Sequence, residues 1–149
     1  MFKHILLTTD GSKLSDKAVK QAISVAKALG AQITAVNVVG EYHLNLQDEG
    51  FAMPELPALK KRFEEAEAAR AKKILDAVRK SAGQAGVKCD AVTVTSDLPY
   101  DAIIKQAKKS RCDVIVMASH GRKGLQGLLL GSETVKVLTH STIPVLVCR

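Results

Sequence analysis

Aromatic residues are scarce in this chain, because tryptophan is absent and the aromatic side chains together make up only 3% of the 149 residues. Apolar residues nevertheless account for 46%. The core must therefore be built from valine, isoleucine, leucine and alanine, which suit buried parallel strands covered by amphipathic helices. Because a chain of this length usually folds around one core, the composition predicts a single α/β domain over residues 1–149.

Cysteine is also scarce, and its spacing excludes the common cysteine-based frameworks. Cys89, Cys112 and Cys148 are odd in number, contain no C-x-x-C pair, and lie in or beside apolar runs, where a thiol behaves as a small hydrophobic group. No stretch approaches the roughly 20 apolar residues that a membrane helix needs, and the opening residues 1–5 lead into a predicted strand rather than a signal peptide. We expect a soluble protein of the reducing cytoplasm.

Acidic residues are outnumbered, which leaves a formal net charge of +7. Basic proteins can bind nucleic acid by releasing counterions from phosphates. The densest basic group, residues 60–80, is interleaved with acidic residues at helical spacing, a pattern typical of a solvated helix face. The few aromatic residues do not cluster into a base-stacking surface. The sequence therefore argues against a nucleic-acid partner.

Apolar patterns along the chain predict alternating strands and helices. The predicted strands are residues 2–9, 31–39, 87–95, 113–118 and 143–148, and the predicted helices are residues 12–29, 58–85, 100–110 and 132–139. Residues 87–95 alternate in polarity, which predicts a strand at the sheet edge, and residues 40–57 carry glycine and prolines typical of a surface loop. The alternation predicts a doubly wound parallel sheet with right-handed crossovers.

The predicted helix starts carry capping residues. Ser12 precedes the first helix, Ser96 and Asp97 precede the third, and Ser132 opens the fourth. In a doubly wound sheet, a ligand crevice opens at the carboxyl ends of the strands, where neighbouring connections leave toward opposite faces. The loops at residues 8–12 and 118–132 are therefore expected to line a crevice.

The segment from Ser119 to Ser132 places glycines between a buried strand and a helix start. Glycines let backbone N–H groups approach phosphate oxygens, and the free amides of a helix N-terminus supply further donors. Ser132 could donate its hydroxyl to phosphate while capping the helix. The alternative is a glycine-rich connector with a capping serine, and the residues alone do not decide between them. Neither the Walker A nor the dinucleotide-binding glycine pattern occurs.

The spacing within this segment resembles the nucleotide loop of the universal stress protein family, which reads G-x-x-G, nine residues, then G-[S/T]. Ala118-Ser-His-Gly121, nine further residues and Gly131-Ser132 fall on that frame. Ile-Leu-Leu-Thr-Thr-Asp-Gly-Ser near the start resembles the family's first strand, and Ser-Thr-Ile-Pro-Val-Leu-Val near the end resembles its last. The resemblance spans the whole chain and implies an adenine nucleotide alpha hydrolase-like fold with strand order 3-2-1-4-5.

The resemblance also implies a site for ATP, with Mg²⁺, at the carboxyl ends of the first and fourth strands. The implied nucleotide-binding residues are Thr9 and Asp10 beside the nucleoside, Val38 and Met117 beside adenine, and Ala118, Gly121, Arg122, Gly131 and Ser132 around the phosphates. Asp10 would bind Mg²⁺, directly or through water; the alternative is an aspartate that shapes the turn. Arg122 and Lys123 have the alternative of being exposed loop cations.

Two features bear on how the site would work. Ala118 stands where the family has its first motif glycine, and a requirement for positive φ there would strain the pocket. Ser119 and His120 are adjacent, and neighbours on a strand end are expected to point to different sides, which argues against a nucleophile and its base. His4, His43 and His140 lack metal-ligand spacing.

We therefore expect a regulatory stress-response protein that binds an adenine nucleotide, with at most slow ATP hydrolysis or autophosphorylation. No catalytic residue is assigned. The resemblance implies a homodimer through the last strand, residues 143–147, which would cover an apolar edge. The alternative is a dimeric interaction module of the same fold that does not bind nucleotide.

Overall fold

The computed structural model describes residues 1–43, 55–121 and 130–149. Its strands are β1 (His4–Thr8), β2 (Gln32–Val39), β3 (Cys89–Thr95), β4 (Val114–Ala118) and β5 (Val145–Cys148), and its helices are α1 (Lys13–Leu29), α2 (Leu56–Gln84), α3 (Pro99–Lys109) and α4 (Ser132–His140). Each element lies within the range that the sequence predicts or within two residues of it. The predicted loop 40–57 falls mostly outside the described residues, and α2 begins at its end.

The strands form one parallel sheet in the order β3-β2-β1-β4-β5, which confirms the predicted topology. β1 lies at the centre, where Ile5 is aligned with Ile33 of β2 on one side and with Val114 of β4 on the other. Every residue of β4 is buried. A continuous apolar run of this kind is expected for a strand covered on both faces. β3 lies at one edge, as its alternating pattern predicted, and β5 lies at the other.

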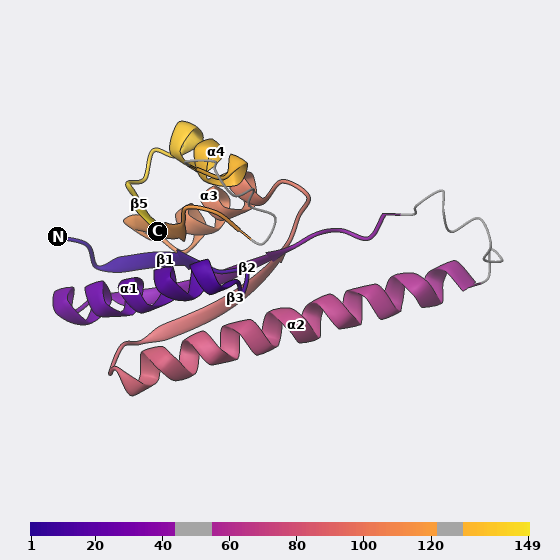
Figure 1. Cartoon of the computed structure of the whole chain (residues 1–149), viewed down its shortest axis with the longest axis horizontal. Helices are drawn as coiled ribbons and strands as arrows, with labels where there is room; N and C mark the ends of the chain where they lie inside the picture. Colours follow the sequence, from indigo (N-terminus) through magenta and orange to yellow (C-terminus); the bar gives the residue numbers. More distant parts are fainter. Residues whose placement is uncertain (44–54, 122–129) are drawn as a thin grey trace.

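Helices cover both faces of the sheet, α1 and α2 on one and α3 and α4 on the other (Figure 1). On the α1 and α2 face, strand residues such as Ile5, Leu7 and Val116 pack against α1 and the carboxyl-terminal half of α2. On the opposite face, Leu6 and Ile115 join a second cluster with residues of α3 and α4. Side chains of one strand alternate between the two cores because successive residues point to opposite faces.

α1 begins as the sequence predicts, because the Ser12 side chain accepts a hydrogen bond from the Ser15 N–H at 3.2 Å. The helix ends at Gly30, which has a φ of 63°. That left-handed conformation suits glycine, which lacks the Cβ that would clash there.

The starts of α3 and α4 differ from the prediction. α3 has no cap from Ser96 or Asp97; instead, Glu133 of α4 accepts the Tyr100 N–H at 2.9 Å. Asp97 is engaged elsewhere, since it accepts the Glu41 N–H at 3.0 Å. Ser132 does not cap α4, because it is already the first residue of the helix and Gly131 stands at the capping position.

α2 is longer than the sheet that it covers. Its buried residues are Ala71, Leu75, Val78 and Ala82, all in the carboxyl-terminal half. The amino-terminal half extends past the end of the strands (Figure 1). Among the helices of the described chain, none combines the length and the apolar character that a membrane span requires.

Candidate functional site

The sheet has a topological switch point between β1 and β4. These neighbouring strands run in the same direction, so their carboxyl ends lie at the same edge of the sheet. β1 leads into α1 on one face, while β4 leads into α4 on the other. In open α/β sheets, ligands bind in the crevice that such diverging connections leave. The predicted site residues are expected to lie around this crevice.

Asp10 and Gly121 come together at the crevice, although 111 positions separate them in the sequence. A Cβ atom added to Gly121 would lie 3.0 Å from Asp10 Oδ2. The absence of a side chain at position 121 is therefore what lets the carboxylate approach the backbone that follows β4. Asp10 Oδ1 also accepts the Ser12 N–H at 3.0 Å, so the turn-shaping role applies to this residue as well.

Thr9 lies just before Asp10 and is buried under the same turn. Its hydroxyl accepts the Gly11 N–H at 3.3 Å and lies 3.1 Å from the Ser15 hydroxyl of α1. Its backbone N–H donates to Val36 O at 3.0 Å. These contacts use the Thr9 side chain to shape the turn that carries Asp10.

Val38 and Met117, the predicted neighbours of adenine, share one face of the sheet. Met117 belongs to the core cluster beneath α3 and α4, and the half-buried Val38 packs against that cluster. Both are near the carboxyl ends of their strands, β2 and β4. The two side chains give this face an apolar wall near the crevice.

Ala118 fits its position without backbone strain. It is the last residue of β4, and its buried side chain packs in the cluster beneath α1 and α2. Among the described residues other than glycine, only Arg111 has a positive φ. The concern that position 118 needs a left-handed conformation therefore does not apply to this chain.

The start of α4 is tied to the end of β4. The Gly131 N–H donates to Ser119 O at 2.8 Å, and the Thr134 hydroxyl donates to the same oxygen at 3.1 Å. A Cβ at Gly131 would lie 3.3 Å from Ser119 O, so a side chain would disturb this junction. The Gly131 N–H is thus already used, and among the described residues that follow it the amide donors for an anion are those of the first turn of α4.

Ser132 opens α4, and in the part of the chain that the structure describes its hydroxyl makes no hydrogen bond. It therefore remains able to donate to a ligand. Arg122 and Lys123, the two predicted cations of the loop, lie outside the described residues.

Ser119 and His120 contact each other, which the sequence reasoning did not expect. His120 Nδ1 lies 3.2 Å from Ser119 Oγ, so the argument that adjacent side chains diverge is wrong here. The strand has ended at Ala118, and the alternation of an extended strand no longer applies. His120 Nε2 is buried and has no hydrogen-bond partner among the residues described, so no carboxylate orients the ring as in a catalytic triad.

The cysteines behave as core residues. Burial raises the pKa of Cys112 to about 11, and burial likewise raises the pKa of Cys89 and of Cys148. Thiols with raised pKa values are poor nucleophiles and poor metal ligands at neutral pH. Across residues 1–43, 55–121 and 130–149, no group of three or more His, Cys, Asp or Glu side chains is placed to hold a metal ion.

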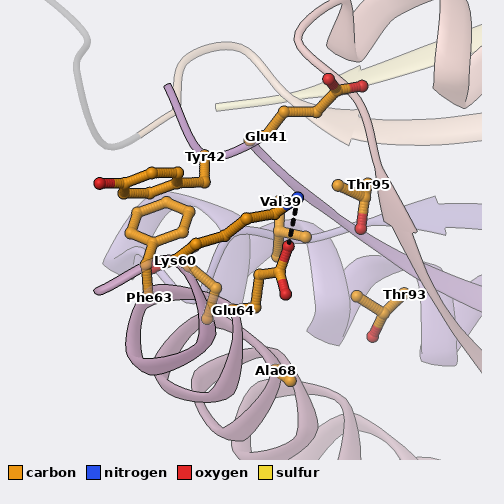
Figure 2. A pocket seen from close by; sticks show the side chains of 11 residues that line it. Val39, Glu41, Tyr42, Lys60, Phe63, Glu64, Ala68, Thr93 and Thr95 are labelled. Atoms are coloured by element: carbon orange, nitrogen blue, oxygen red, sulfur yellow. Dashed lines mark ion pairs between the residues drawn. The ribbon is translucent and has the colours of Figure 1, made fainter. Parts of the chain in front are cut away.

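A groove of about 310 Å³ lies away from this crevice, between the amino-terminal half of α2 and the ends of β2 and β3 (Figure 2). Tyr42 packs on Phe63 at its side, with ring centroids 5.5 Å apart. Lys60 is paired with Glu64 at 3.7 Å across the surface of α2. No local pattern in the sequence marks this groove, because its aromatic pair joins two separate segments of the chain. The groove is open, and Lys60, Glu64 and Glu67 on its α2 side are each engaged in an ion pair, so we favour the crevice as the functional site.

Comparisons with known proteins agree with the fold. The model of the universal stress protein family matches residues 1–149. Universal stress protein MJ0531 of Methanocaldococcus jannaschii is 34% identical over 150 residues, which cover 100% of this chain and 83% of that protein. The solved structure of protein MJ0577 from the same organism has a TM-score of 0.82 at 26% identity, with 99% of this chain and 96% of that chain covered.

Some structures with the same fold contain a nucleotide. A universal stress protein in complex with cAMP has a TM-score of 0.71 at 25% identity and covers 99% of this chain and 97% of its own. An Archaeoglobus fulgidus protein in complex with dAMP and an Arabidopsis thaliana protein with AMP have TM-scores of 0.68 and 0.69. Their identities of 15% and 17% establish a shared fold alone.

Proposed function

The chain belongs to the universal stress protein family, and on that premise we propose that it binds an adenine nucleotide at the carboxyl ends of β1 and β4. The observation that carries the proposal is the close approach of Asp10 and Gly121 at the switch point of the sheet. Relatives of the same fold that hold cAMP, dAMP or AMP support it. In this proposal the apolar wall of Val38 and Met117 borders adenine, and Asp10 lies near the ribose or a hydrated Mg²⁺.

ATP is the proposed nucleotide, and the proposed role is regulatory. The start of α4 offers the Ser132 hydroxyl and helix N-terminal amides to phosphate. Ser119 and His120 lack an orienting carboxylate within the described chain, which favours at most slow turnover over fast hydrolysis. A cytoplasmic role in the stress response follows as a proposal from family membership.

Nucleotide binding is tested by thermal unfolding and titration calorimetry with ATP and Mg²⁺, ADP, AMP, cAMP and, as a control for the base, GTP. A ligand at a hundred times its Kd stabilises the folded state by about 2.7 kcal/mol. For a chain of this size that is a rise in Tm of roughly 5–10 °C. We expect the adenine nucleotides to produce such a rise and GTP to produce little. No heat with any adenine nucleotide, and no adenine in the purified protein, would favour the interaction module instead.

We also propose a homodimer that forms through β5. This strand is an edge of the sheet, and exposed apolar side chains lie on it and on α4: Leu146 is 41% exposed, Val135 46% and Leu138 42%. An uncovered apolar edge strand tends to pair with another chain. A second copy related by a two-fold axis would cover the same edge on both subunits.

The dimer is tested with a Leu146→Lys variant. We expect the wild type to sediment as a dimer. In the variant the dissociation constant of the dimer should be roughly tenfold higher, because the change places a charge in an apolar contact. Leu98→Lys is the matched control, since Leu98 is also exposed but lies before α3. A wild type that sediments as a monomer at all concentrations, or equal effects of the two variants, would contradict the interface.

A further inference from the structure

One polar side chain interrupts an apolar row on β2. Ile33 and Ala35 belong to the core cluster beneath α1 and α2, Val39 of the same row faces α2 at the groove, and all three are buried. Asn37 occupies the next position of the same row and is 0% exposed. A fully buried asparagine needs hydrogen bonds to offset the loss of water.

Only half of the Asn37 amide is satisfied within the described residues. Nδ2 donates to the backbone carbonyl oxygen of Thr9 at 2.7 Å, whereas the buried Oδ1 has no hydrogen-bond partner. An unpaired buried acceptor reduces stability by more than one ordinary hydrogen bond restores. An apolar side chain at position 37 would remove the unpaired oxygen but would also leave the Thr9 carbonyl without its donor, so the two effects on stability oppose each other. Stability alone therefore does not explain why this position is asparagine.

The bond that Asn37 does make acts on the peptide that leads to Asp10. The regular ladder between β1 and β2 ends with Thr8 opposite Val36. One residue later, the Thr9 N–H still donates to Val36 O at 3.0 Å, but the Thr9 carbonyl takes its hydrogen bond from the Asn37 side chain. Both polar groups of the Thr9 backbone are thus held by β2 at the point where the chain leaves the sheet.

The Thr9 side chain completes this attachment. Its hydroxyl contacts Gly11 and the buried Ser15 of α1. With Thr9 fixed by β2 and by α1, the next residue, Asp10, is directed to Gly121 across the crevice. Rotation of the peptide between Thr9 and Asp10 would move the carboxylate away from that position.

We propose that Asn37 is a positioning residue of the nucleotide site: it holds the Thr9 carbonyl so that the Asp10 carboxylate faces Gly121. This inference rests on the proposed nucleotide function. Asn37 itself lies inside the core and acts through Thr9 and Asp10. Within the described residues its Oδ1 has no partner, while its Nδ2 fixes the turn that carries the ligand-facing carboxylate.

The test compares Asn37→Leu and Asn37→Val with a control, Thr34→Val. Both Asn37 variants remove the side-chain amide and place an apolar side chain in this row of β2. Thr34 is also buried on β2, where its hydroxyl contacts His4 Nε2 at 2.8 Å, at the amino-terminal end of β1, and forms a hydrogen bond with the Cys112 thiol. The control thus removes side-chain hydrogen bonding from the same strand at a distance from the crevice.

We expect the Asn37 variants to unfold close to the wild-type temperature, because losing the unpaired Oδ1 offsets leaving the Thr9 carbonyl without its donor. They should nevertheless bind AMP and ATP with Mg²⁺ about tenfold more weakly, the loss that one buried hydrogen bond represents. Hydrogen exchange should be faster at the Gly11 and Ser12 amides, and the amides of the strands should exchange at the wild-type rate. Thr34→Val should lower the unfolding temperature without changing the Kd or those two amides. One folded Asn37 variant, Leu or Val, is sufficient for this test.

The exchange measurement separates the two proposals. A wild type that binds no adenine nucleotide defeats the nucleotide function, and the exchange of Gly11 and Ser12 then still tests the positioning. If that exchange is unchanged in the Asn37 variants, the positioning is overturned. If the wild type binds but the Asn37 variants bind equally well, the nucleotide function stands and the role of Asn37 falls.

Discussion

A Gly121→Asp variant is expected to lose adenine-nucleotide binding while keeping its fold. The new Cβ would lie 3.0 Å from Asp10 Oδ2, and its carboxylate would stand beside that of Asp10. Two like charges about 4 Å apart repel by about 4 kcal/mol at the effective dielectric of a protein surface. We therefore expect the Kd for ATP to rise at least roughly a hundredfold. The fold should persist because Gly121 is exposed and has no left-handed φ.

Two further variants separate the causes of this loss. Gly121→Ala adds the Cβ without charge, so it displaces Asp10 and should weaken binding less. Gly83→Asp places the same charge on an exposed residue of α2, where an added Cβ meets nothing within 4 Å. Titration calorimetry gives the Kd and circular dichroism gives the unfolding temperature. Wild-type affinity in Gly121→Asp would show that Asp10 and Gly121 do not border the ligand.

The order of elements was predictable because it depends on local patterns. The nearly pure apolar run at residues 113–118 contains the fully buried β4, and the alternating residues 87–95 contain the edge strand β3. Ser12 and Gly30 bound α1 as predicted because a cap involves residues within one turn of the helix. Strand order itself came from the family resemblance, which periodicity alone does not supply.

Contacts between distant segments were not predictable in this way. α3 receives its cap from Glu133, which lies 33 residues beyond the capped Tyr100, so no local signal marks the partner. The Gly131 N–H is used by Ser119 because α4 is folded back onto the end of β4. In the sequence, Asn37 is one polar residue within a predicted strand. Its role becomes apparent only from its hydrogen bond to the Thr9 carbonyl on the neighbouring strand segment.

The candidate site was predicted partly by pattern and partly by resemblance. From the residues alone, the glycine-rich segment remained either a phosphate loop or a connector. The structure adds the approach of Asp10 to Gly121, which a pattern within either loop does not contain. It also removes the strain argument at Ala118, because that residue has an ordinary strand conformation.

A Gly11→Ala variant is expected to lose about 3 kcal/mol of unfolding free energy, from a left-handed residue and an overpacked contact together. Gly11 has a φ of +75°, and an added Cβ would lie 2.8 Å from Ile74 Cδ1 of α2. Gly30→Ala is the matched control: its φ is +63°, but an added Cβ meets nothing within 4 Å. The control should therefore lose only the conformational part, about 1–2 kcal/mol. Urea unfolding followed by circular dichroism measures both.

The contact with α2 is tested separately by adding Ile74→Ala. In the wild type this change removes partly buried apolar surface and should destabilise the protein. In the Gly11→Ala background it also removes the atoms that the new Cβ meets, so its effect should be smaller by about 1 kcal/mol or more, as for residues in direct contact. Additive effects, or equal losses in Gly11→Ala and Gly30→Ala, would mean that the turn carrying Asp10 does not rest on Ile74. A coupled result would show that α2 supports the site-bearing turn from beneath, where β2 and α1 hold it through Thr9.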